Sequence, residues 1–233
     1  MTAMNNLVSS SATIGVVISL LAYQLGAFLK NRTKKAIFNP LLISIALVIV
    51  FLLVFDIDYD NYNQSAKYLS YLLTPATVSL AIPLYQQLDM LKKNWLAVII
   101  GITSGVLTSL VSVLLMSMVF GLTHAEYVTL LPKSITTAIG MGISEELGGY
   151  PTITVAVIIV TGIFGNMIAE ALCKLFRIKH PISKGLAIGT SSHAMGTSKA
   201  IEMGQIEGAM SSLSIVVAGL MTVVLASVFA MFY

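Results

Sequence analysis

Two polar segments interrupt an otherwise apolar sequence and carry the residues best suited to chemistry. Residues 131–149 contain a proline, four glycines, four hydroxyl side chains and three charges. Residues 185–204 form the most polar segment of the chain's second half. These segments, with one asparagine between them, supply the candidate substrate-binding residues: Lys133, Ser134, Thr136, Thr137, Ser144, Glu145, Asn166, Ser191, Ser192, His193, Thr197, Lys199 and Glu202.

The chemistry that these residues favour is the binding of a small carboxylate. Helix N-termini at a break present free N–H groups and partial positive charge. With Lys133 and Lys199 nearby, such breaks suit an anionic metabolite better than a cation. Backbone that leaves regular helix inside a bilayer must face protein or a watery cavity, so a cavity is expected there. The residues expected to break the helices are Pro75, Pro83, Pro132, Gly140, Gly142, Gly189 and Gly196.

Several of these residues also have simpler interpretations. Glycine, serine and threonine let membrane helices approach closely, and Glu145 is solvated if it lies at the membrane surface. His193 is a candidate proton carrier because imidazole titrates near neutral pH, but a lone histidine among hydroxyls is often only hydrogen-bonded. Asn166 and Glu170 lie one helical turn apart and share a face. Coupling to H⁺ or Na⁺ is therefore left open.

Enzymatic and metal-binding functions are not expected. Ser191, Ser192 and His193 invite comparison with an intramembrane serine protease, but adjacent residues rarely point at one another and no glycine-serine elbow is present. The three histidines have no useful ligand spacing, and no basic stripe indicates nucleic-acid binding. The lone Cys173 is interpreted as a packing residue. The sequence predicts no metal and no cofactor.

The elements that must position these segments are membrane spans. Charged residues make up 10% of the chain and hydrophobic residues 57%, with a mean hydropathy of +0.91, whereas soluble domains carry about 25% charged residues. A segment needs about 20 mostly apolar residues to cross the hydrocarbon layer. The chain is therefore predicted to be an all-α, multi-pass membrane protein, with spans at residues 10–29, 40–56, 68–88, 95–120, 152–173 and 208–233.

The basic residues set the orientation, because Lys and Arg in short loops stay on the cytoplasmic side. With the basic loops inside, span 95–120 runs outward and span 152–173 runs inward. Residues 128–149 must then start and finish outside, and residues 185–204 dip in from the cytoplasm by the same logic. The alternative is that both stretches cross fully as broken helices. The basic clusters are Lys30, Arg32, Lys34 and Lys35; Lys92 and Lys93; and Lys174, Arg177, Lys179 and Lys184.

An internal repeat supports this topology. Residues 132–139 match residues 75–82 at an offset of 57 residues, and Gly162 matches Gly105 at the same offset. A further step of 57 residues carries Gly162 onto Gly219. The units starting near residues 128 and 185 have opposite orientations, as in many secondary transporters. We therefore expect an inverted-repeat, secondary-transporter-like bundle of about six full spans plus two broken or re-entrant segments. Its parts are scaffold spans at 1–66 and core units at 67–127, 128–184 and 185–233.

The chain also resembles the LrgB/CidB family of bacterial membrane proteins over essentially its whole length. The resemblance rests on Pro132-Lys-Ser, Ser144-Glu-Glu-Leu-Gly-Gly, Thr161-Gly-Ile-Phe-Gly and Ser192-His-Ala-Met-Gly-Thr-Ser-Lys-Ala.

The resemblance implies two functional accounts. One is an antiholin-like or holin-like regulator of murein hydrolases and autolysis, working with a small LrgA/CidA-type membrane partner. The other is transport of small monocarboxylates, because the plant plastid relative is a glycolate/glycerate translocator and bacterial members resemble pyruvate uptake systems. We favour transport in the bacterial plasma membrane, with spans 10–29 and 40–56 as scaffold and dimer interface.

Overall fold

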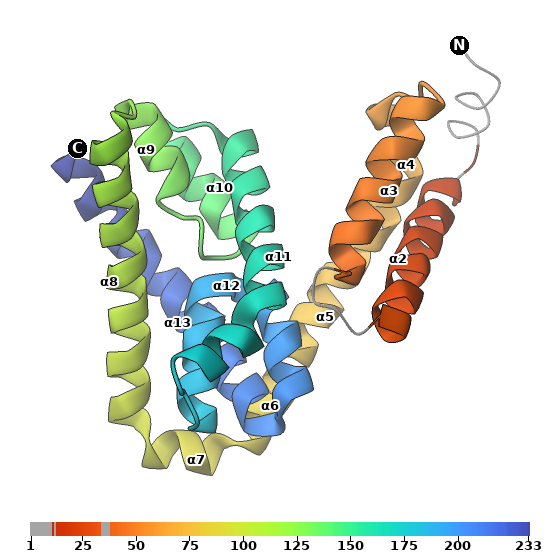
Figure 1. The fold of residues 1–233 in the computed structure, drawn as a ribbon. Helices are drawn as coiled ribbons and strands as arrows, with labels where there is room; N and C mark the ends of the chain where they lie inside the picture. The colour runs from red at the N-terminus through yellow and green to blue at the C-terminus, as the bar shows by residue number, and fades with distance from the viewer. Residues whose placement is uncertain (1–10, 12, 34–37) are drawn as a thin grey trace. The chain divides into compact units, whose positions relative to one another are not determined.

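A computed structural model describes residues 11, 13–33 and 38–233 (Figure 1). Every regular element among these residues is helical. The chain divides into two compact units, Met1–Ser79 and Leu80–Tyr233. The basic residues Lys34 and Lys35 lie outside the described part.

The first unit is a helical hairpin with a short return segment. Asn39 caps the second helix, because its side chain accepts hydrogen bonds from the N–H groups of Leu41 and Leu42. The Ser65 hydroxyl accepts a hydrogen bond from Gly15 N–H at 2.8 Å, which joins the return segment to the first helix. The helices are α2 (Ile14–Thr33), α3 (Pro40–Val54), α4 (Tyr59–Ala66), the 3₁₀ helix η1 (Lys67–Leu72) and α5 (Leu73–Ser79).

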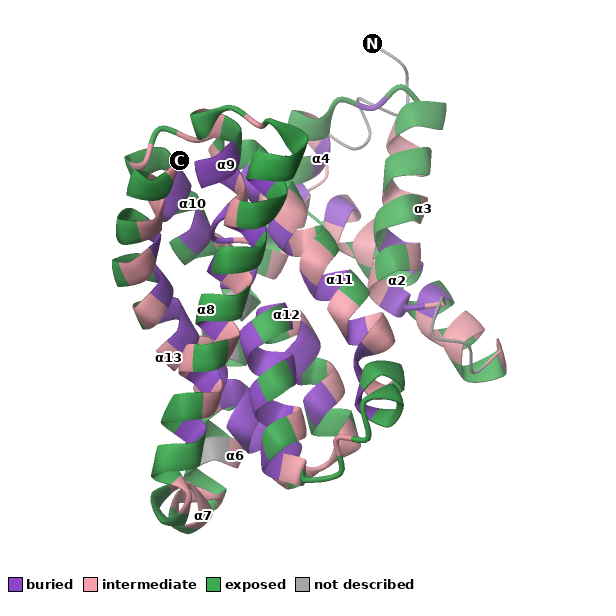
Figure 2. Cartoon of the chain, turned by 60° about the vertical axis from the view of Figure 1, so that its left-hand side comes forward, coloured by how far each residue is buried: buried purple, intermediate pink, exposed green. Residues whose placement is uncertain are grey.

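The second unit is a bundle around α12 and α13, where Figure 2 shows many of the buried positions. One face of α8 packs into its core, since the buried residues Ile102, Val106 and Leu110 recur every four residues. The helices are α6 (Ala81–Gln86), α7 (Leu88–Lys93), α8 (Trp95–Phe120), α9 (His124–Leu130), α10 (Thr137–Glu146), α11 (Pro151–Leu175), α12 (Pro181–Met203), α13 (Gln205–Phe229) and the 3₁₀ helix η2 (Ala230–Phe232).

A first hairpin, residues 124–149, enters the bundle and returns to the same end. Its two ends meet, because the Thr129 hydroxyl accepts a hydrogen bond from Tyr150 N–H at 2.8 Å and Thr154 donates to the Thr129 carbonyl at 2.9 Å. Its tip, residues 131–136, reaches Ser109 of α8, which lies about 16 Å of helix from the end at Phe120. The hairpin therefore reaches about half the depth of a bilayer core.

A second hairpin, residues 181–203, enters from the opposite end. The α12 backbone reverses at His193, whose φ and ψ are 42° and −140°. The first arm begins and the second arm ends beside the start of α13. A Cβ on Gly185 of the first arm would lie 2.7 Å from the Met210 Cβ, and a Cβ on Gly208 would lie 3.1 Å from the Ile201 Cα of the second arm. This geometry is that of a re-entrant hairpin rather than a broken helix that crosses fully.

The prediction of six full spans holds only in part. Four described helices are long and apolar enough to cross a membrane, namely α2, α8, α11 and α13 with η2. Helix α3 has 15 residues, about 22 Å, which is short of the roughly 30 Å hydrocarbon layer. The predicted span at 68–88 is a chain of short helices instead, with interruptions at Leu80 and Gln87.

The predicted helix breaks also need correction. Only Pro132 lies at a break, in the turn after α9. Pro75 and Pro83 stand in the first turns of α5 and α6, where a missing N–H costs little. The four glycines Gly140, Gly142, Gly189 and Gly196 are all inside helical segments. Three of them allow close packing, whereas the space around Gly142 is open.

Candidate functional site

A lysine and a serine at the tip of the first hairpin meet a serine of α8 in the middle of the second unit. The Lys133 Nζ lies 3.0 Å from the Ser134 Oγ and 3.3 Å from the Ser109 Oγ of α8. The two serine oxygens are 3.1 Å apart. Ser134 is buried and Lys133 is half-buried. The cluster therefore presents one positive charge and two hydroxyls at about half the membrane depth.

The second hairpin borders the same region. Thr190 lies with Ser109 and Ser134 around one small gap between the two tips. Beside it, a groove of about 540 Å³ runs along α11 and is lined by Lys133 from the first hairpin and by Ser191 and Ser192 from the second. The two polar segments of the sequence thus meet at one groove.

Lys133 has an incomplete electrostatic environment. Among the residues that the structure describes, no carboxylate forms an ion pair with it. A lysine charge at the centre of a membrane helix costs about 2.5–3.5 kcal/mol on insertion scales. Hydroxyls solvate an ammonium group but do not neutralise it. An anion that entered the groove would supply the missing countercharge.

The tip of the second hairpin is held by α11 through polar contacts. His193 Nε2 lies 3.0 Å from the Ile158 carbonyl oxygen. The Asn166 amide donates to the Met195 carbonyl at 2.7 Å, which satisfies an acceptor just beyond the backbone reversal. Gly162 and Gly165 let the tip approach, because a Cβ on either would collide with the side chain of His193 or Ser192. His193 and Asn166 thus hold the tip in place.

The backbone of His193 yields a stability prediction. Replacement with valine should destabilise the protein by about 1–3 kcal/mol more than replacement with glycine, because a β-branched residue is strained at φ 42° and ψ −140° and glycine adopts this region freely. Both variants lose the imidazole, so their difference isolates the backbone. Thermal unfolding in detergent measures it, and equal melting temperatures would contradict the strain at this position.

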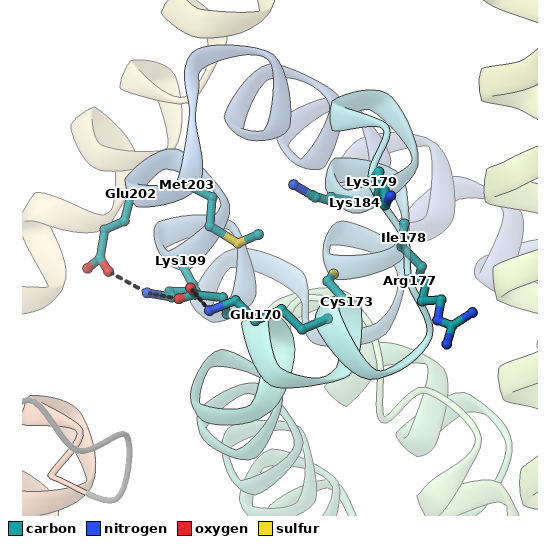
Figure 3. A pocket seen from close by; sticks show the side chains of 10 residues that line it. Glu170, Cys173, Arg177, Ile178, Lys179, Lys184, Lys199, Glu202 and Met203 are labelled. Carbon is teal, nitrogen blue, oxygen red and sulfur yellow. Dashed lines mark hydrogen bonds and ion pairs between the residues drawn. The ribbon is translucent and has the colours of Figure 1, made fainter.

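A basic pocket of about 610 Å³ lies where α11 ends and α12 begins. Figure 3 shows Lys199 between Glu170 and Glu202, which it contacts at 3.4 and 3.2 Å. The remaining basic side chains come from the end of α11, the loop that follows and the start of α12. The lining residues are Glu170, Cys173, Lys174, Arg177, Ile178, Lys179, Lys184, Lys199, Glu202 and Met203.

Several predicted site residues lie away from the tips. Ser144 bonds to Thr154 at the outer end of the first hairpin, and Glu145 is exposed at that end. Thr197 is buried against Ser211 at 2.7 Å. Lys199 and Glu202 belong to the basic pocket.

Thr136 and Thr137 begin α10, directly after the first tip, and both are half-buried.

Three residues that line the site were not among the candidate binding residues. Ser109 and Thr161 come from long apolar spans, where a lone hydroxyl is typical of helix packing. Cys173, interpreted as a packing residue, is buried but lines both the groove and the basic pocket. The sequence feature that could have pointed to Ser109 is Gly105, one turn earlier on α8. In the structure this glycine lets Thr190 of the second hairpin approach α8 closely.

Comparison with known proteins places the chain in a family. Residues 19–232 match the profile of the LrgB-like family. The chain is 42% identical over 219 residues to the antiholin-like protein LrgB of Bacillus mycoides (strain KBAB4), covering 94% of this chain and 95% of the relative. It is 41% identical, with the same coverage, to the proteins of that name from Bacillus cereus (strain B4264) and Bacillus anthracis (strain CDC 684 / NRRL 3495). No solved structure matches it significantly. The chain therefore belongs to the LrgB-like family of membrane proteins.

Proposed function

We propose that the protein is a membrane carrier for small monocarboxylates of the pyruvate, glycolate and glycerate type. The observation that carries the proposal is the meeting of two hairpin tips at a groove that holds Lys133, a cation with no carboxylate partner among the described residues. A carboxylate bound there would form charge-assisted hydrogen bonds to the ammonium group. The hydroxyls of Ser109, Ser134 and Ser191 would bind a substrate hydroxyl or keto oxygen.

The charge of the site favours a monoanion. Among the described residues that line the groove, Lys133 is the only basic one. A dicarboxylate would bring a second negative charge into the low-dielectric interior without a partner, which is costly. A single carboxylate group on a small polar molecule fits both the charge and the hydroxyls.

The arrangement of the hairpins supports a carrier over a simple pore. Each hairpin is followed by a long span, α11 after the first and α13 after the second, and the two pairs enter from opposite ends. Inverted pairs of this kind, with a site at mid-depth, serve alternating access in secondary transporters. We propose that the hairpins and their spans form the moving core, with H⁺ or Na⁺ as the coupling ion.

The cellular setting follows from charge and from the relatives. Lys92, Lys93 and the basic pocket lie at the same end of the second unit, because α8 and α11 cross once each in opposite directions. We place this end in the cytoplasm of a bacterium, with the protein in the plasma membrane. Partners would be a second copy of the chain, through its first two helices, and a small LrgA/CidA-type membrane protein.

Uptake by the purified chain tests the proposal directly. Liposomes that contain the protein should take up radiolabelled pyruvate, glycolate or glycerate saturably, with and without a pH gradient, and should retain an enclosed dye. Empty liposomes and liposomes with heat-unfolded protein are the controls. The absence of both uptake and dye release, in preparations that gel filtration shows to be folded, would contradict transport by this chain alone.

The relatives' name, antiholin-like protein, favours a second candidate. We propose as this alternative an antiholin-like or holin-like protein that controls murein hydrolases and autolysis. The two candidates predict different results in the same vesicles. A pore would release the dye and would not saturate with substrate. A carrier would saturate and retain the dye, and its effect on autolysis would then be indirect.

A further inference from the structure

The basic pocket and the groove are neighbours. Both are lined by Cys173 and Ile178, so the polar pocket at the end of α11 adjoins the apolar part of the groove. Five basic and two acidic side chains line the pocket. The groove beyond it is lined by Phe164, Leu172 and Phe176, which are 59%, 40% and 69% exposed. A charged head and an apolar tail would both be matched here.

The basic charge of the pocket exceeds what its own carboxylates neutralise. Lys174 and Lys199 pair with Glu170, and Lys199 also pairs with Glu202. Lys184 contacts Glu207 at 3.8 Å. Within the described part of the chain, Arg177 and Lys179 form no ion pair.

The dimensions of the groove match one leaflet. The α11 wall from Phe164 to Phe176 measures about 18 Å at the rise of an α-helix. Half of the hydrocarbon core is about 15 Å. A chain that starts at the basic pocket and follows this wall would end near the tip of the second hairpin, where Gly165 meets Ser192.

From these observations we propose that the basic pocket and the adjoining groove bind one anionic phospholipid, of the phosphatidylglycerol or cardiolipin class. The phosphate lies against Arg177, Lys179 and Lys184, and one acyl chain lies along Leu172 and Phe176. Basic pockets between helices at the cytoplasmic face are suited to such headgroups. The proposal goes beyond transport, and it places the acyl chain in the same groove whose Ser191 and Ser192 end would hold the carboxylate, so lipid and substrate would meet at that end.

Cys173 offers a direct readout, because it is the only cysteine in the chain and lies where the pocket meets the groove. The protein is placed in nanodiscs of pure phosphatidylcholine or of phosphatidylcholine with phosphatidylglycerol. The rate of modification by a small neutral thiol reagent is then measured. Bound lipid should slow the reaction at least about tenfold in the phosphatidylglycerol discs. A third sample, phosphatidylcholine discs with inorganic phosphate, tests the headgroup chemistry alone.

Two double variants with the same loss of charge separate the site from general surface attraction. R177Q/K179Q should abolish the difference between the two lipids, whereas K92Q/K93Q, at the same end but outside the pocket, should retain it. Comparing the two lipids within each variant cancels any change in the intrinsic reactivity of the thiol. Equal rates in both lipids, or the same protection by inorganic phosphate, would overturn the proposal. So would an undiminished lipid effect in R177Q/K179Q.

Discussion

Replacing Lys133 with glutamine is expected to abolish carboxylate uptake while leaving the protein folded. The ammonium group lies at the tip of the first hairpin, between two serine hydroxyls and without a carboxylate partner in the described part of the chain. Removing one member of a buried charge pair typically costs 2–5 kcal/mol of binding free energy, which corresponds to about 30-fold to several thousand-fold in affinity. Uptake into liposomes at a fixed low substrate concentration measures the loss.

The control for this prediction is Lys92→Gln, which removes the same charge from an exposed position on α7. It should transport at the rate of the unmodified protein. Lys133→Arg keeps the charge, but its planar fork replaces a compact ammonium group, so we expect partial activity. Lys133→Gln with unchanged membrane abundance and uptake within threefold of the unmodified protein would exclude Lys133 as the anion-binding group.

The sequence predicted the long helices of the second unit and a hairpin between α8 and α11, because both depend on gross physical properties. Hydrophobic length identifies α8, α11 and α13. The requirement that residues 128–149 start and finish outside followed from the basic residues at the two ends, and the structure has a hairpin there. Such arguments need only the count of crossings, so they do not depend on side-chain detail.

The details of the breaks could not be predicted, because they depend on neighbours distant in sequence. The backbone reverses at His193, a residue whose type does not favour positive φ as glycine does. It is held there by Ile158 and Asn166 on another helix. Gly189 and Gly196 were both expected to break the helix, yet both are helical.

The candidate site was predicted in part for the same reason. Two of the expected residues, Lys133 and Ser191, line one groove, since each lies near the tip of a polar segment. Lys199 was expected beside them, but the return arm of the second hairpin carries it back to the basic pocket and to Glu170. In a straight helix that crossed the membrane it would have continued away from that end, so its place depends on the reversal.

The second large effect is expected at Gly189, where alanine should destabilise the protein. A Cβ at this position would collide with the Ser211 carbonyl oxygen and would lie 2.7 Å from the Ser214 Cβ, both on α13. Backbone on a packed helix cannot move aside as a flexible side chain can, and overpacking of this kind costs about 1–3 kcal/mol. Thermal unfolding in detergent should show a melting temperature lower by several degrees, at about 2–4 °C per kcal/mol.

Gly142→Ala is the matched control, because this glycine is also inside a helix but, among the described residues, no atom beyond its own helical turn lies within 4 Å of the added Cβ. The alanine at this position should raise the free energy of unfolding of the protein by about 0.5–1 kcal/mol through helix propensity alone. A drop in melting temperature as large as that of Gly189→Ala would mean that packing space does not decide the outcome. If Gly189→Ala instead keeps its melting temperature and loses uptake, Gly189 acts as a hinge for the first arm of the second hairpin, which carries Ser191 and Ser192 to the groove. A lower melting temperature together with loss of uptake would indicate that this arm must pack against α13 for the groove to form.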